Sequence, residues 1–258
     1  AVACVAGITY TMGGLQVGHD VYADGAEGGH RNHYGFYLGM ARATGGVSGS
    51  ALGVQGADVG HLSVNAYSLA GYWTHIGPSG WYTDTVVSGS ALTADATSSE
   101  NVHASTHGTA VTASVEGGLP LSIGHGLTME PQLQLVYQHL SIRDLNDGAA
   151  NVSFGSGNSV LARFGVRFSG TWDALGAAWQ PFVAFNVLHA FANGDRQTYD
   201  SVTSIGTPVN QTTGRIDAGL VTRFSKHGSA YAAVNWGANL DGEHVRTIGG
   251  NAGVRWSW

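Results

Sequence analysis

Apolar and polar residues alternate along much of this chain, most regularly at its carboxyl end. Between residues 247 and 258 every second position is apolar or glycine, with Ile248, Val254 and Trp256 among the apolar ones. The same period of two recurs in residues 111–119, 127–138, 164–168 and 215–224. Successive side chains of a β-strand point to opposite sides, so this period predicts strands with one apolar and one polar face. The pattern predicts an all-β protein.

The links between the predicted strands alternate between short turns and longer polar loops. The short turns are residues 77–80, 124–126 and 225–228, and the long loops are residues 44–61, 93–107, 142–158 and 192–213. A soluble sandwich gives no reason for such sorting, whereas outer-membrane barrels have short periplasmic turns and long extracellular loops. Predicted strands of about 10 to 14 residues also suffice for the ~9–11 tilted residues that cross a bilayer. The links therefore favour a transmembrane β-barrel.

The number of strands sets the expected size of the barrel. About eleven strands can be placed from residue 11 onward, and bacterial barrels have an even number of strands. Residues 1–11 are where a further strand would have to begin. The prediction is one transmembrane antiparallel β-barrel domain of about 12 strands over residues 1–258, whose first strand is expected to be incomplete.

The composition agrees with a folded β-protein and narrows its partners. Charged residues make up 11% of the chain, hydrophobic residues 43%, and there are 40 glycines, which is unlike a disordered segment. The net charge is −6 and the basic residues form no cluster, so no nucleic-acid partner is expected. Cys4 is the only cysteine, so neither an intrachain disulfide nor a cysteine zinc site can form. No run approaches the ~18 consecutive apolar residues of a membrane helix, so a membrane-spanning form would use strands.

Aromatic residues gather at predicted strand ends beside the short turns. They are Tyr72, Trp73, Trp81, Tyr82, Trp172, Trp179, Trp256 and Trp258. Outer-membrane barrels carry girdles of aromatic side chains at both bilayer interfaces. These residues are therefore expected to form the girdle on the side of the short turns.

Six segments, in order along the chain, resemble the C-terminal β-domain of autotransporters. They are GGLQVGHDVY (residues 13–22), AGYWTHIGPSGWYTDTVV (70–87), TASVEGGLPLSIGHGLTMEPQLQLVYQ (112–138), LARFGVRF (161–168), QPFVAFNVLHAF (180–191) and GGNAGVRWSW (249–258). The resemblance covers nearly the whole chain and implies a barrel of about twelve strands in the outer membrane of a Gram-negative bacterium. It also implies type V secretion, in which the barrel anchors an N-terminal passenger and helps to export it to the cell surface with the barrel-assembly machinery.

The polar positions of the predicted strands include charges of both signs. Eight of these residues are expected to face the lumen: Glu116, Glu130, Arg163, Arg167, Arg215, Asp217, Arg223 and Arg255. Asp20 and Asp84 are expected to join them, and on residues 127–138 Leu133 should face lipid and Gln132 water. In one interpretation the charges form hydrated ion pairs that hold the shape of the lumen, each contributing ~0–1 kcal/mol. In the other, suggested by the resemblance, they line the path of a passing chain or hold a plug helix.

Twelve histidines suggest a metal or catalytic site, because histidine is the commonest metal ligand and a general base near neutral pH. Most of them lie in predicted loops, turns or strand ends, so solvated or interfacial histidines are expected, with no metal or cofactor. There is no Gly-x-Ser-x-Gly sequence, and the nearest approach is GSGNS at residues 155–159. The chain is interpreted as a translocator and not an enzyme, with an outer-membrane hydrolase and a small passive pore as alternatives. Porins usually need about 16 strands, more than this chain provides.

The last predicted strand carries an apolar edge formed by Val254, Trp256 and Trp258. The resembling family shows this pattern at its C-terminus, where its assembly machinery reads it. The strand must also pair with a neighbour, because unpaired backbone groups in lipid cost several kcal/mol each. These three residues are therefore expected to be an assembly signal. The expected partners are outer-membrane lipid, the passenger of the same precursor and the barrel-assembly machinery, and the barrel is expected to be a monomer.

Overall fold

The chain forms antiparallel β-sheet throughout the part that the structure describes. The structure is a computed structural model that describes residues 7–25, 29–51, 54–146, 151–154, 156–174, 176–192, 195–199, 203–207, 211–225, 227–241 and 245–256. The strands are β1 (Gly7–Asp24), β2 (Arg31–Ala51), β3 (Val54–Ile76), β4 (Tyr82–Ser98), β5 (His103–Gly118), β6 (Leu121–Gly124), β7 (Leu127–Ile142), β8 (Leu145–Asn146), β9 (Asn151–Phe154), β10 (Gly157–Gly170), β11 (Trp172–Ala174), β12 (Ala177–Ala192), β13 (Asp195–Tyr199), β14 (Thr203–Thr207), β15 (Gln211–Arg223), β16 (Gly228–Asn239) and β17 (Arg246–Trp256). The predicted all-β class is confirmed.

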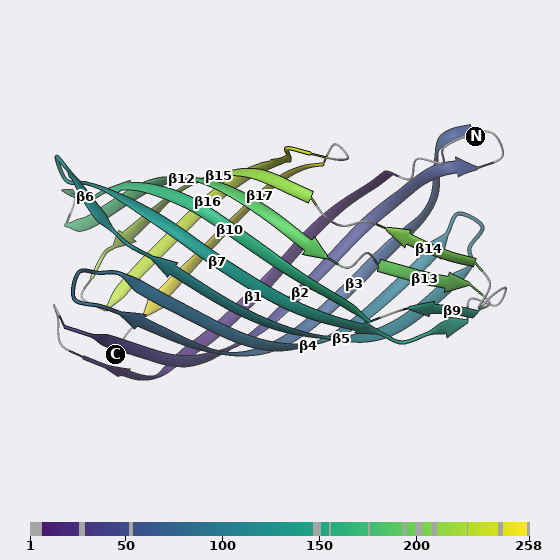
Figure 1. The fold of residues 1–258 in the computed structure, drawn as a ribbon, viewed down its shortest axis with the longest axis horizontal. Coiled ribbons are helices and arrows are strands. Elements are labelled where there is room, and N and C mark those ends of the chain that lie inside the picture. Colours follow the sequence, from purple (N-terminus) through teal and green to yellow (C-terminus); the bar gives the residue numbers. More distant parts are fainter. Residues whose placement is uncertain are drawn as a thin grey trace.

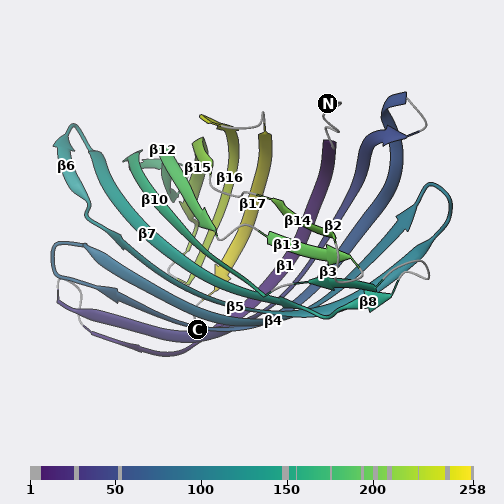
Figure 2. The same ribbon diagram turned by 45° about the vertical axis from the view of Figure 1, so that its right-hand side comes forward.

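One sheet of thirteen strands forms the body of the molecule. The short strands β6 and β11 pair only with β7 and β12, so eleven strands follow one another in chain order from β1 to β17. Each is antiparallel to the next. The sheet curls strongly and brings β17 back beside β1 (Figures 1 and 2). This is the predicted antiparallel barrel.

Several strands are longer than the sequence pattern predicts. Strands β1 to β5 contain 16 to 23 residues, so much of the segments 44–61 and 93–107, expected as loops, is paired strand. These strand ends are rich in Gly, Ser, Ala and Thr and lack a regular apolar face. Backbone pairing does not require an apolar face, so the ladder continues past the apolar band.

The other two long links carry a second, four-stranded sheet with the order β14-β13-β9-β8. Its strands come from the segments 142–158 and 192–213, which were expected to be loops. The two segments are joined by the pairing of β13 with β9, from Gln197↔Phe154 to Tyr199↔Val152. The long links are therefore partly ordered by pairing with each other.

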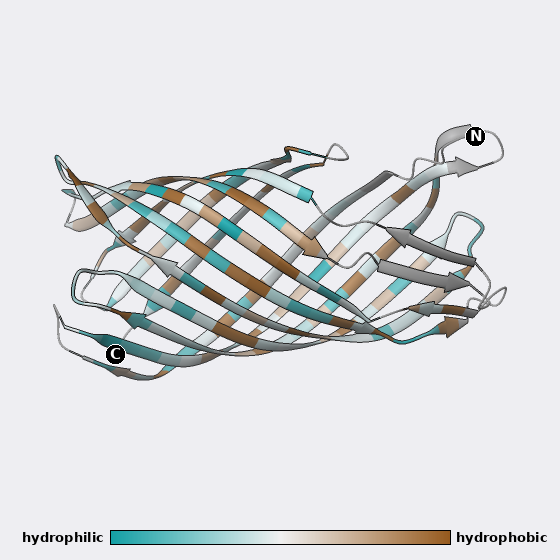
Figure 3. Ribbon diagram, viewed as in Figure 1, coloured by the Kyte–Doolittle hydropathy of each residue, from teal (hydrophilic) through white to brown (hydrophobic). Residues whose placement is uncertain are grey.

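The register places large apolar side chains on one face of the barrel wall. Leu133 lies opposite Phe164, and Phe164 opposite Val187, with 57%, 56% and 47% of these residues exposed. Figure 3 shows apolar and polar positions alternating along the strands. Contiguous exposed apolar surface of this kind marks contact with a membrane or a partner. We call this side the apolar face. Among the described residues, no helix is long and apolar enough to span a membrane.

The two end strands of the sheet meet through side chains. Within the described residues no backbone pairing joins β1 to β17. Both strands run in the same direction because they are the first and the last of eleven strands that alternate in direction. The guanidinium group of Arg255 on β17 forms an ion pair with the carboxylate of Asp20 on β1. The further strand expected to begin in residues 1–11 is not confirmed: residues 7–11 belong to β1, and residues 1–6 lie outside the described part.

Candidate functional site: a polar face across the sheet

Polar side chains cross the sheet on the side opposite the apolar face. We call this side the polar face. Its charged members include Asp20, Asp84, Glu116, Glu130, Arg163, Arg167, Arg215, Asp217, Arg223 and Arg255. The register explains their alignment, since Asp84 pairs with Glu116, Glu116 with Gln134, and Gln134 with Arg163. One row thus crosses β4, β5, β7 and β10.

The guanidinium group of Arg163 is the centre of this face. Its Nη2 atom lies 2.8 Å from Oε2 of Glu116 in an ion pair. Its Nη1 atom donates to Oε1 of Gln132 at 3.1 Å and to Oδ1 of Asn186 at 2.9 Å, and its Nε atom donates to Oε1 of Gln134 at 3.0 Å. The five donors of an arginine suit such a role. One cation therefore connects side chains of β5, β7, β10 and β12.

Tyr82 lies between two carboxylates on the β4 to β7 side. Its hydroxyl donates to Oε1 of Glu116 at 2.8 Å and is 3.4 Å from Oε1 of Glu130. The amide nitrogen of Gln132 donates to Glu130 at 2.6 Å and to the Tyr82 hydroxyl at 3.1 Å. The tyrosine ring lies across Gly118 of β5, where a Cβ atom would overlap it. Glycine at this position lets β4 and β7 make contact over the strand between them.

The network continues toward the C-terminal strands. The amide nitrogen of Asn186 donates to the carboxylate of Asp217, and Nε of Arg215 lies 3.1 Å from Oδ2 of the same Asp217. Arg167 behaves differently, because its guanidinium carbon stacks 4.0 Å from the centroid of the Phe182 ring. Arg163 and Arg215 are thus held by acids, whereas Arg167 is held by an aromatic face.

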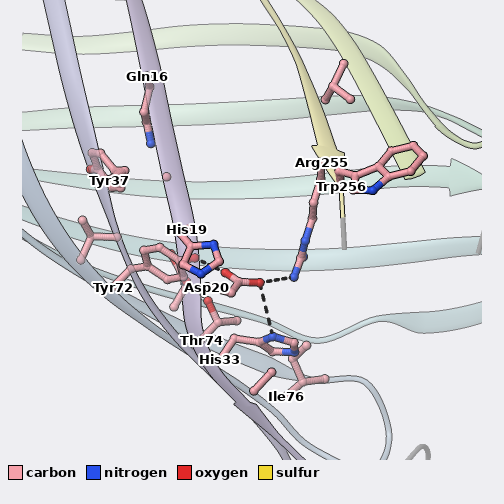
Figure 4. Close-up of a pocket in the computed structure, with 15 residues that line it drawn as sticks. Gln16, His19, Asp20, His33, Tyr37, Tyr72, Thr74, Ile76, Arg255 and Trp256 are labelled. Atoms are coloured by element: carbon pink, nitrogen blue, oxygen red, sulfur yellow. Dashed lines mark hydrogen bonds and ion pairs between the residues drawn. The ribbon is translucent and has the colours of Figure 1, made fainter. Parts of the chain in front are cut away.

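A second cluster lies where the two ends of the sheet meet. The hydroxyl of Tyr72 on β3 donates to Asp20 across Gly35 of β2, where any Cβ atom would overlap the tyrosine. The carboxylate of Asp20 also forms an ion pair with the guanidinium group of Arg255 on β17, and Nδ1 of His33 lies 3.9 Å from the same carboxylate. Figure 4 shows these side chains converging on Asp20. They line a cavity of about 1020 Å³.

Two expectations about single residues are wrong. Gln132 was expected to face water, but only 8% of it is exposed, because it is enclosed by its hydrogen bonds to Arg163 and Glu130. Tyr72 and Tyr82 were expected in the interfacial girdle, but both hydroxyls bond to carboxylates of the polar face. The reason is the period of two, because each tyrosine is adjacent to a tryptophan and the two must point to opposite sides.

Several members of the network escaped sequence reasoning. They are Tyr72, Tyr82, Gln132, Gln134 and Asn186. Residues two positions apart on a strand point to the same face, and this could have placed them on the polar face. Tyr82 is two residues from Asp84, and Gln132 and Gln134 are two and four residues from Glu130. Which of them bond to each other depends on the register between strands.

The described residues give no support to a catalytic or metal site. No group of three or more His, Cys, Asp or Glu side chains in this part of the chain could hold a metal ion. In the GSGNS sequence, residue 155 lies outside the described part, and Asn158 bonds to His139 at 2.9 Å. Where the structure describes them, Ser156 and Ser159 have no hydrogen bond to a histidine or a carboxylate. Among the residues that the structure describes here, no serine is activated by a base.

Comparison with known proteins identifies the family. The sequence profile of the autotransporter β-domain matches residues 4–235. The chain belongs to the autotransporter β-domain family. It is therefore a translocator β-domain of type V secretion, located in the outer membrane of a Gram-negative bacterium, as the sequence pattern and the resemblance predicted.

Solved structures of autotransporter barrels share this fold. The β-domain of the Bordetella autotransporter BrkA is 21% identical, with a TM-score of 0.77 over 97% of this chain and 92% of that one. The transport unit of AIDA-I from Escherichia coli is 18% identical, with a TM-score of 0.82 over 98% of this chain and 84% of that one. The translocator domain of NalP from Neisseria meningitidis is 14% identical, with a TM-score of 0.62 over 98% and 87%.

One curated relative is much longer than the segment that it shares with this chain. The autotransporter CRAC of Citrobacter rodentium is 21% identical over 144 residues, which are 55% of this chain and 9% of that protein. The match therefore covers a small part of the relative's length.

The substitution Arg163→Ala tests whether the network holds the wall together. It leaves the Glu116 carboxylate without its cation, so we expect the free energy of unfolding in detergent to fall by about 2 to 4 kcal/mol, measured by urea titration of the heat-modifiable band. Arg223→Ala is the matched control, because Arg223 is exposed and forms no ion pair within the described residues. We expect that change to cost less than about 0.5 kcal/mol. Equal losses for the two variants would contradict the network.

Proposed function

We propose that the polar face lines the lumen of the barrel and forms the wall along which the N-terminal passenger is carried. One observation supports this most directly. Asp20 and Arg255 lie on the two end strands and touch each other. Side chains from opposite ends of a curled sheet converge in this way when their face is on the inside of the curl.

The bonding of this face suits a path for a passing chain. Glu116, Arg163, Arg215 and Asp217 already have partners of opposite charge in the wall. A polypeptide that passes would therefore find a hydrated polar surface on which these four charges are already neutralised. Of the two roles considered from the sequence, this is the lining of a path for a passing chain. It includes the other role, because the same ion pairs also hold the shape of the lumen.

We also propose that the apolar edge of β17 is the assembly signal. The exposed fractions are 74% for Val254 and 57% for Trp256, and Ile248, earlier on the same strand, is 87% exposed. Trp258, the third expected residue, lies outside the described part. This ridge offers the barrel-assembly machinery a strand with an apolar side, and after assembly it would contact outer-membrane lipid. The continuous apolar face fits a monomer surrounded by lipid.

Site-specific photo-crosslinking in a precursor with an attached passenger tests the lumen path. A benzophenone amino acid at Ser88, on the polar face of β4, should crosslink to the passenger during export, because it faces the lumen. The neighbouring Val87 lies on the apolar face and is 54% exposed, so the same probe there should give no passenger adduct. Passenger adducts of equal yield at both positions would refute the proposed path.

A terminal deletion tests the assembly signal. Removing residues 256–258 should leave unfolded protein in the periplasm, because both the recognition edge and part of the wall are lost. Removing residues 203–205, an equal length from β14 in the small sheet, should leave assembly intact. The measurement is the fraction of heat-modifiable barrel in outer-membrane fractions. Normal barrel levels after the terminal deletion would disprove the signal.

A further inference from the structure

The charges of the polar face are sorted by sign around the wall. The sector from β1 to β7 carries the acids Asp20, Asp84, Glu116 and Glu130, and the sector from β10 to β17 carries the arginines Arg163, Arg167, Arg215, Arg223 and Arg255. Three described residues depart from this sorting. Asp217 is paired with Arg215 inside the basic sector, and Asp173 on β11 lies opposite Ala178, which in turn lies opposite Arg223. Arg31 lies at the first position of β2.

Ion pairs lie where the two sectors meet. Glu116 bonds to Arg163 at the border between β7 and β10, and Asp20 bonds to Arg255 at the border between β17 and β1. The sectors are thus joined at both edges by neutralised pairs. Asp84 and Arg223 lie farther inside their sectors, whereas Glu130 and Arg167 lie on the border strands β7 and β10.

Asp84, Glu130, Arg167 and Arg223 have no partner of opposite sign within 4.0 Å among the described residues. On the acidic side, Asp84 accepts from the hydroxyl of Thr74, and Glu130 accepts from Gln132. On the basic side, Arg167 stacks on Phe182 although its register partner on β7 is Glu130. These contacts fix the side chains in place without cancelling their charge.

We propose that the lumen has a transverse electric polarity and binds a polypeptide segment with basic side chains on one flank and acidic side chains on the other. The proposal rests on the polar face being the lumen. A narrow aqueous space with low-dielectric walls focuses the field of its charges. Lysines of the segment would face Asp84 and Glu130, and its acids would face Arg167 and Arg223.

A segment of mixed and segregated charge fits this wall better than a segment of one sign. The sectors nearly balance each other, so a wholly basic or wholly acidic segment is attracted by one side and repelled by the other. Bringing like charges together across an interface is unfavourable. The polarity therefore favours segments whose basic and acidic side chains lie on opposite flanks. It also fixes the orientation of the bound segment about the barrel axis.

Binding of two designed peptides tests the polarity. Both are helices of about 18 residues with the same numbers of Lys, Glu, Ala and Ser, labelled with one fluorophore. In one, Lys and Glu occupy opposite flanks, and in the other the same residues are mixed around the axis. Fluorescence anisotropy with the folded barrel in neutral detergent should show about ten-fold tighter binding of the segregated peptide at low salt. The difference should shrink at high salt.

A matched pair of double variants locates the effect. Arg167→Gln with Arg223→Gln should reduce the preference to less than about two-fold, because it removes the uncompensated basic charges. Arg42→Gln with Arg246→Gln removes the same charge from the apolar-face side of β2 and β17, and should leave the preference unchanged. Heat-modifiability shows that each variant is folded.

Three results would overturn the proposal: equal affinity of the two peptides, binding of neither, or the same loss in both double variants. The crosslinking of Ser88 separates such a failure from failure of the proposed function. Passenger adducts at Ser88 together with equal peptide affinities would leave the export path standing and reject the polarity. Absence of adducts at Ser88 would reject the lumen assignment itself.

Discussion

The antiparallel hydrogen-bond ladder is the constraint on which the rest of this barrel depends. An unpaired backbone N–H or C=O in hydrocarbon costs several kcal/mol, so a chain can cross a bilayer in strands only if neighbouring strands satisfy each other. The ladder runs in chain order from β1 to β17 and fixes the register between neighbours. Register in turn fixes which side chains share a face, because a slip of one residue would exchange the two faces. The row from Asp84 to Arg163 exists for this reason.

Side chains then connect strands that the ladder does not pair directly. Tyr72 reaches from β3 to β1 across Gly35, and Tyr82 reaches from β4 to β7 across Gly118. In both places a glycine provides the space that a side chain would occupy. These contacts tie together alternate strands, which backbone pairing alone does not connect. The polar network is thus a structural element as well as the surface proposed for transport.

The sequence was sufficient for the fold because its main signals are properties of single strands and links. The period of two in residues 127–138 predicts a strand and both its faces, and the alternation of link lengths predicts the membrane barrel. The paired extensions within residues 44–61 and 93–107 were missed because small and polar residues can pair without an apolar face. The partners of Arg163 were missed because they depend on register among β7, β10 and β12, which no local pattern encodes. Tyr82 was wrongly placed in the interfacial girdle because it is aromatic. Its spacing of two residues from Asp84 already indicated the polar face.

The central claim is that consecutive residues of one strand face two different environments, hydrocarbon and an aqueous lumen. Spin labels placed one at a time along residues 129–138 of β7 in lipid vesicles test it most directly, by collision with oxygen and with a water-soluble nickel complex. We expect a period of two, with odd positions such as Leu133 and Leu135 more accessible to oxygen, and even positions such as Gln134 and Gln138 more accessible to nickel. A profile without this alternation, or one with nickel favouring the odd positions, would contradict it.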